Sequence, residues 1–249
     1  MENMYDIRQK RAEAPISEDC KHFFDDVYPK LLGNTSPKYT IEDCCSVPLF
    51  KCSAGSLIEV NFEKQNLKGY IPPIRLNGLQ YLSFEGNQLT GKIPTQLGEL
   101  KNLTFLNLIG NKLEGTLPPI FQSLTKLSVL AFSNNSLTGV IPSQIGSLAS
   151  LSLLMNNNNF TGQLPPELGN LSNLTYFGFN TNRLEGPVPS GLWKLKYLEF
   201  LDIYSNKFTG QIPSEINQLK SIKLLWLGEN SFSGPIPTTI GDLNQLNSL

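Results

Sequence analysis

A short motif, Gly-x-(Ile/Leu/Val)-Pro, recurs along most of the chain at an almost constant interval. The eight copies begin at Gly69, Gly91, Gly115, Gly139, Gly162, Gly186, Gly210 and Gly234. Neighbouring copies are 22 to 24 residues apart. A unit of this length cannot bury an apolar face alone, so such repeats stack into a solenoid in which each coil covers the next.

An apolar pattern of period two precedes each motif. In the third repeat it consists of Leu106 and Leu108, followed by Asn111 and Leu113. The alternation places both leucines on one face of a short strand, and stacked strands form a parallel sheet along the concave wall. Gly tolerates positive φ and Pro prevents a long helix, so the convex side is predicted to be mostly irregular or 3₁₀.

The asparagine after each strand can both donate and accept, and we expect it to satisfy backbone groups where the chain leaves the sheet. One coil is a residue short between Leu151 and Gly162, which leaves its ladder position ambiguous between Asn158 and Asn159. We take Asn158 and treat the missing residue as a local irregularity. The predicted ladder is Asn87, Asn111, Asn135, Asn158, Asn182, Asn206 and Asn230, with Gln65 in the first slot.

The full pattern, Leu-x-x-Leu-x-x-Leu-x-Leu-x-x-Asn-x-Leu-x-Gly-x-Ile-Pro, resembles the plant-type subclass of leucine-rich repeats over residues 57–249. Leu-Thr-Gly-Lys-Ile-Pro at 89–94 matches it closely. The resemblance implies an α/β solenoid, a right-handed superhelix with a concave parallel sheet. It also implies a module like the ectodomains of plant receptor-like kinases and receptor-like proteins, or like polygalacturonase-inhibiting proteins. Those proteins recognise peptides, steroids, co-receptors or pectin-degrading enzymes.

Three regions are expected along the chain. Residues 1–15 are predicted to be a disordered tail, 16–55 an amino-terminal cap with disulfides, and 56–249 eight repeats of 22–24 residues. Because the chain stops at Leu249, at the first strand leucine of a ninth coil, we expect the solenoid to be truncated there.

The cap is predicted to begin with one amphipathic helix. Ser17 is a suitable N-cap, Glu18 and Asp19 favour the first turn, and Gly33 ends the helix. The apolar stripe that should pack on the first coil is Cys20, Phe23, Phe24, Val27, Tyr28, Leu31 and Leu32.

All four cysteines, Cys20, Cys44, Cys45 and Cys52, lie in the cap, where they allow three pairings. Adjacent cysteines rarely bridge each other, and we expect Cys20–Cys44 and Cys45–Cys52. A zinc site with His22 as an extra ligand is the competing interpretation. The spacing lacks the Cys-x₂-Cys pairs of structural zinc sites, so no metal is predicted.

Charge and processing signals bear on location. The formal net charge is −1, which argues against nucleic acid or an anionic membrane as the main partner, and no apolar run is long enough to cross a bilayer. The polar start lacks a secretory leader, whereas paired cysteines favour an extracellular or cell-surface location. Six glycosylation sequons lean the same way: Asn34, Asn102, Asn134, Asn159, Asn170 and Asn173. A cytosolic scaffold and a fragment of a receptor-like kinase are the alternatives.

No catalytic pattern or cofactor motif stands out: the single histidine, His22, lies in the cap, and the glycines belong to repeat turns. We therefore predict a non-catalytic module that binds a protein, peptide or glycan ligand, with a co-receptor as a further candidate partner. The apolar residues before the strand leucines, Tyr81 and Phe105 among them, are assigned to core packing between coils. The candidate ligand-binding residues of the concave face are Glu63, Glu85, Asn180, Asp202, Tyr204 and Trp226.

Overall fold

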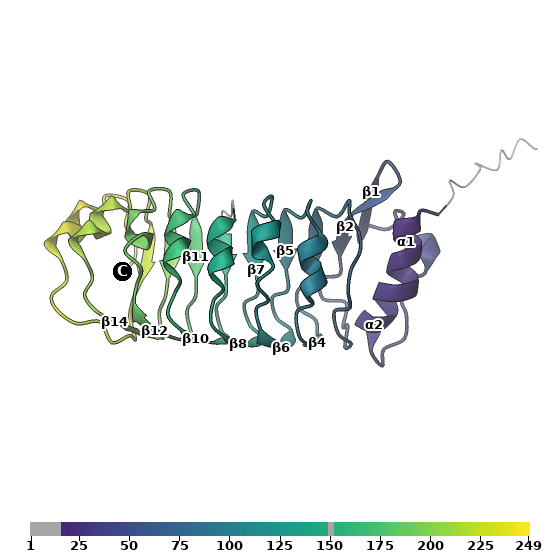
Figure 1. Ribbon diagram of the computed structural model, residues 1–249, viewed down its shortest axis with the longest axis horizontal. Coiled ribbons are helices and arrows are strands. Elements are labelled where there is room, and N and C mark those ends of the chain that lie inside the picture. The colour runs from purple at the N-terminus through teal and green to yellow at the C-terminus, as the bar shows by residue number, and fades with distance from the viewer. Residues whose placement is uncertain (1–15, 149–151) are drawn as a thin grey trace, which may run out of the picture.

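The computed structural model describes residues 16–148 and 152–249; the predicted tail at 1–15 lies outside them. These residues form the predicted α/β solenoid, with the cap at one end and the coils stacked in chain order (Figure 1). Within the two described ranges, no helix has the length and apolar character needed to cross a membrane.

The concave wall is a nine-stranded sheet in the order β1-β2-β3-β5-β7-β9-β11-β13-β15, parallel except at its first pair. The register holds through the short coil, where Ala131 pairs with Leu154 and Leu154 pairs with Gly178. The strands are β1 (Phe50–Ser53), β2 (Ser56–Asn61), β3 (Tyr81–Ser83), β5 (Phe105–Asn107), β7 (Val129–Ala131), β9 (Ser152–Leu154), β11 (Tyr176–Gly178), β13 (Phe200–Asp202) and β15 (Leu224–Trp226).

A second parallel sheet, which the sequence pattern did not predict, runs along the other edge of the coils (Figure 1). Its six strands lie around the Gly of the motif, where consecutive coils are close enough to pair. They are β4 (Thr90–Gly91), β6 (Lys112–Thr116), β8 (Ser136–Gly139), β10 (Asn159–Gly162), β12 (Arg183–Pro187) and β14 (Lys207–Thr209).

The convex side carries short 3₁₀ helices, as expected from the proline that begins each of these segments. They are η3 (Thr95–Glu99), η4 (Phe121–Ser123), η5 (Ser143–Ser147), η6 (Pro166–Asn170), η7 (Leu192–Lys194), η8 (Ser214–Gln218) and η9 (Thr238–Asp242). Between the two sheets and these turns lies one continuous apolar core, to which every coil contributes its repeat leucines. Trp193 is 2% exposed and packs there, as predicted.

The cap helix is continuous over α1 (Glu18–His22), the π-helical η1 (Phe23–Val27) and α2 (Tyr28–Leu32). Pro29 lacks the N–H that would bond to the preceding turn, and the π-helical stretch falls immediately before it. The Ser17 side chain accepts a hydrogen bond from the Cys20 N–H at 3.2 Å, the predicted N-cap. The apolar stripe of the helix is buried, apart from the half-buried Phe24.

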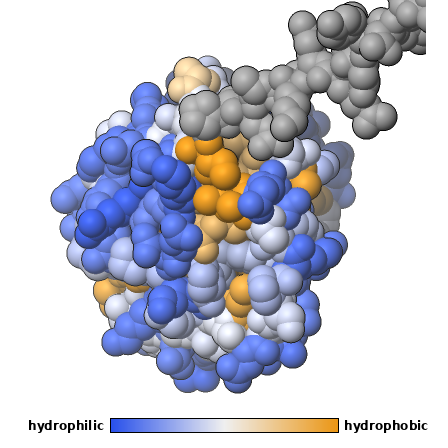
Figure 2. Space-filling view, turned by 90° about the vertical axis from the view of Figure 1, so that its right-hand side faces the viewer, coloured by the Kyte–Doolittle hydropathy of each residue, from blue (hydrophilic) through white to orange (hydrophobic). Residues whose placement is uncertain are grey.

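The two disulfides join Cys20 to Cys44 and Cys45 to Cys52, which is the expected pairing. Between them lies the 3₁₀ helix η2 (Ile41–Asp43). The outer face of the cap is mainly hydrophilic, with one narrow apolar strip (Figure 2). The cap therefore covers the apolar edge of the first coil and presents a polar surface in its place.

The asparagine ladder joins consecutive coils. Asn111, for example, accepts a hydrogen bond at its Oδ1 from the Leu89 N–H of the previous coil. Its Nδ2 group donates to the carbonyl oxygens of Phe84, in the previous coil, and Leu108, in its own. In the short coil this position is occupied by Asn158, which bonds to the Leu137 N–H in the same way. Gln65 departs from the pattern, because its Oε1 accepts from the Tyr39 hydroxyl of the cap.

Candidate functional site

Three columns of side chains project from the concave sheet, because alternate residues of a strand point to opposite faces. The first column is Glu59, Tyr81, Phe105, Val129, Ser152, Tyr176, Phe200 and Leu224. The second is Asn61, Ser83, Asn107, Ala131, Leu154, Gly178, Asp202 and Trp226. The third follows two residues later and is Glu63, Glu85, Ile109, Ser133, Asn156, Asn180, Tyr204 and Gly228.

The core assignment of the first column is wrong. Tyr81 and Phe105 are half-buried, but they lie outside the core and stack on each other at 4.3 Å between ring centroids. Tyr176 and Phe200 make a similar contact at 5.5 Å. The intervening strand leucine, such as Leu82, takes the inward direction, so these rings line the concave surface.

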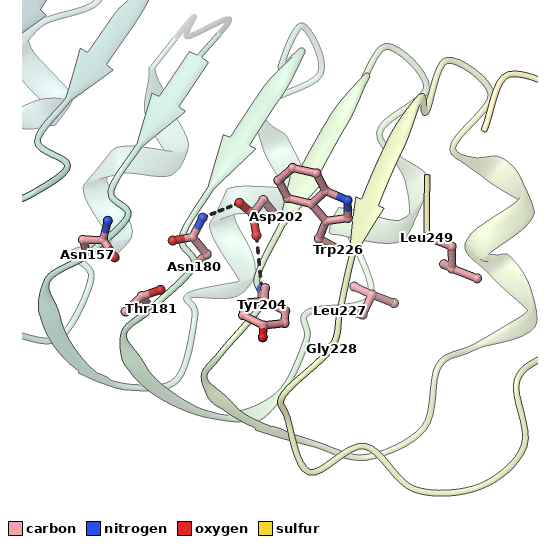
Figure 3. Close-up of a pocket in the computed structure, with 9 residues that line it drawn as sticks. All are labelled: Asn157, Asn180, Thr181, Asp202, Tyr204, Trp226, Leu227, Gly228 and Leu249. Atoms are coloured by element: carbon pink, nitrogen blue, oxygen red, sulfur yellow. Dashed lines mark hydrogen bonds between the residues drawn. The ribbon is translucent and has the colours of Figure 1, made fainter. Parts of the chain in front are cut away.

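The predicted ligand-binding residues fall into two separate groups. Asn180, Asp202, Tyr204 and Trp226 line one groove of about 580 Å³ at the end of the sheet formed by β11, β13 and β15 (Figure 3). Sequence reasoning missed the rest of its lining, which is Asn157, Thr181, Leu227, Gly228 and Leu249. Asn157 and Thr181 directly follow the third column, and this shared position is the signal that pointed to them.

The floor of the groove contains Asp202. Its carboxylate accepts hydrogen bonds from the Asn180 Nδ2 group and from the Tyr204 N–H, the latter at 3.2 Å (Figure 3). Asp202 is 5% exposed, and burial raises the pKa of its carboxyl, while these two hydrogen bonds oppose the shift. The groove therefore holds a partly desolvated acid at its base.

Two aromatic rings border the groove. Trp226 is 41% exposed and donates from Nε1 to the Ser248 hydroxyl at 3.0 Å. Tyr204 is 40% exposed and its ring lies over Gly228, where an added Cβ would be 3.3 Å from the ring. Glu229 lies beside the Tyr204 hydroxyl and raises the pKa of that group. The fixed indole and the glycine floor give the groove a defined shape.

Glu63 and Glu85 lie at the opposite end of the concave face, away from the groove. The Glu63 carboxylate accepts from the hydroxyls of Tyr81 at 3.3 Å and Ser83 at 3.0 Å. Glu85 accepts from the Asn107 Nδ2 group at 2.7 Å. Glu59, beside them, pairs with Lys51 of the cap at 2.6 Å. The acids of this end are therefore engaged within the protein.

The fold and this surface define a class of leucine-rich-repeat solenoids with a side-chain-rich concave face. The family model described as a leucine-rich repeat region matches residues 64–184, and a single leucine-rich repeat model matches 197–219. The chain belongs to the plant-type leucine-rich-repeat family. Among curated proteins, no match to the chain is found.

Solved structures of plant receptors are similar to the chain. The ectodomain of GASSHO1/SCHENGEN3 from Arabidopsis thaliana, in complex with CASPARIAN STRIP INTEGRITY FACTOR 2, is 33% identical with a TM-score of 0.81, over 82% of this chain and 25% of that one. The Arabidopsis receptor kinase HAESA, with the peptide hormone IDA and the co-receptor SERK1, is 32% identical with a TM-score of 0.70, over 81% and 39%. The chain thus spans a quarter to two fifths of these ectodomains.

A plant ice-binding protein matches along nearly its whole length. It is 26% identical with a TM-score of 0.58, and the alignment covers 94% of this chain and 95% of that protein.

Proposed function

We propose that the chain is a non-catalytic recognition module that binds an extended peptide segment of its ligand along the concave face. The observation that carries the proposal is the groove in which Tyr204 and Trp226 stand exposed beside a buried acid. Exposed aromatic residues in a shaped depression are typical binding anchors, because they bury a large area with few rotatable bonds. The peptide complexes of GASSHO1/SCHENGEN3 and HAESA support a peptide as the ligand class.

The test is capture from a random peptide library displayed on phage, with the purified chain as bait. A double variant, Tyr204→Ala with Trp226→Ala, is expected to lose at least about tenfold in recovery of the selected peptides. Tyr197→Ala is the matched control, since Tyr197 is equally exposed but does not line the groove. Equal recovery by the double variant and the wild-type chain would refute the proposed site.

An extracellular location is part of the proposal. It is supported by the two disulfides of the cap, since such bridges persist in oxidising compartments. Accessible sequons also favour it: Asn34, Asn134, Asn170 and Asn173 are exposed. Asn102 and Asn159 are half-buried, and the Asn102 side chain donates to the Asn77 carbonyl. Secretion from a eukaryotic host followed by glycan mapping should show modification at the four exposed sites; an unmodified secreted chain would contradict this.

Ice binding is a second candidate function, favoured by the alignment that covers nearly all of both chains. The surface in question is the outer face of the second sheet, where Thr90, Thr138 and Thr161 are exposed at one repeat position. Glu114 and Glu185 occupy the same position in other coils and interrupt the threonine array. Peptide recognition is therefore preferred. Thermal hysteresis of the purified chain would reverse that preference.

A further inference from the structure

The concave face is free of positive charge, although the chain as a whole is nearly neutral. Eight coils and three columns give 24 outward positions, all within the described residues, and none is Lys or Arg. Four of them, Glu59, Glu63, Glu85 and Asp202, are acidic. The chain carries 20 Lys and Arg residues, so their absence from this face is a property of the face and not of the composition.

Asp202 differs from the other three acids in what surrounds it. Glu59 pairs with a lysine, and Glu63 and Glu85 accept from neighbouring side chains, all at the far end of the sheet. Asp202 takes part in no ion pair among the residues that the structure describes. Its two accepted hydrogen bonds use about half of the roughly four acceptor sites of a carboxylate, which leaves capacity for a charged donor.

The walls of the groove fit the same kind of donor. The Trp226 indole and the Tyr204 ring flank the Asp202 carboxylate from neighbouring coils (Figure 3). Aromatic faces attract cations, and Trp does so most strongly. Glu229, beside the Tyr204 hydroxyl, adds a second negative charge close to the groove. Charge and ring geometry both point to a positively charged group.

We propose that this groove binds an arginine side chain presented by an extended peptide, with the guanidinium group against Asp202 and its plane against Trp226. The inference rests on the proposed function and names the chemistry of its ligand. Arginine is favoured over lysine because its planar group can stack on a ring and donate two parallel hydrogen bonds to one carboxylate.

The test compares two probes of equal shape, acetyl-Gly-Ser-Arg-Ser-Gly-amide and the same peptide with citrulline in place of arginine. Binding is followed by amide chemical shifts of the ¹⁵N-labelled chain. The arginine peptide is expected to shift groove residues and to bind about tenfold more tightly than the citrulline peptide. Asp202→Asn should remove this difference, and Glu185→Gln, on the exposed second sheet, should retain it.

A second pair of variants guards against a folding defect in Asp202→Asn. Trp226→Phe keeps an aromatic face and should retain part of the preference for arginine, whereas Trp226→Leu should abolish it. Equal binding of both peptides in the groove would overturn the arginine assignment and leave peptide recognition standing. Binding of neither peptide at millimolar concentration would overturn the assignment as well, while the library capture tests the proposed function independently.

Discussion

Asn180 donates a hydrogen bond from its Nδ2 group to the carboxylate of Asp202 in the next coil. The same diagonal contact, from the third column of one coil to the second column of the next, joins Glu85 to Asn107 at 2.7 Å. Polar residues on the concave face are therefore paired between coils, and the pairing fixes the direction of the Asp202 carboxylate. The groove depends on this contact as much as on its aromatic rings.

The buried position of Asp202 makes a prediction about pH. Burial raises the pKa of this carboxyl above its ordinary 3.8 in the unfolded chain. The protonated form is thus favoured in the folded state, so stability is present below the unfolded pKa and lost as pH rises through the folded pKa. Asp202→Asn does not titrate, so its free energy of unfolding should gain on the wild type between about pH 3 and about pH 7.

Urea denaturation of both proteins at the two pH values measures this effect. Asp25→Asn, a substitution at an exposed acid of the cap helix, is the matched control. A wild-type chain that gains on Asp202→Asn as pH rises would contradict the assignment of burial as the dominant cause.

The junction between cap and first coil should depend on Gly69. Its N–H donates to the Leu31 carbonyl at 2.9 Å, and an added Cβ would lie 1.7 Å from the Lys30 carbonyl oxygen. Gly69→Ala must therefore separate the cap helix from the coil, and we expect a loss of more than about 2 kcal/mol in the free energy of unfolding. Gly241→Ala, where nothing lies within 4 Å of the new Cβ, should be near neutral. Thermal or chemical denaturation compares the two.

The asparagine ladder should be a large contributor to stability. Asn111→Ala leaves the Leu89 N–H and the carbonyls of Phe84 and Leu108 without this partner in a buried setting. Each unsatisfied buried group costs about 1–3 kcal/mol, so the expected loss is roughly 3 kcal/mol or more. Asn77→Ala, at an exposed position, is the control. Comparable denaturation midpoints for the two variants would show that the ladder is not a structural element.

Much of the fold was predictable because the repeat constrains it. The period fixed the stacking, and the alternation of leucines at positions such as Leu106 and Leu108 fixed the inward face of each strand. The second sheet was not predictable, since two or three residues around each glycine carry no strand pattern of their own. Its strands form only because the coils bring them side by side.

The candidate site was only partly predictable, for two physical reasons. Tyr81 and Phe105 are apolar and half-buried on either face of a strand, so composition could not distinguish the core from the concave surface. Leu154 was left unassigned because one residue is missing before it, and only the strand pairing shows that it occupies the second column. The grouping of Asn180 with Trp226 across three coils depends on the superhelix and has no local signal.

The last prediction concerns Tyr81, which stacks on Phe105 at the other end of the concave face. Burial, followed by the negative charge of Glu63, raises the pKa of Tyr81 to about 12. The neutral phenol is favoured in the folded state, so its contribution to stability is present below about pH 10 and is lost as pH rises towards about 12. Absorbance at about 295 nm should show a late ionisation step that Tyr81→Phe removes. Glu63→Gln should lower the pKa of Tyr81 only in part, because burial is the larger cause. Tyr70→Phe, at an exposed tyrosine, should leave the late step in place, and its disappearance in that variant would show that the step belongs to another residue.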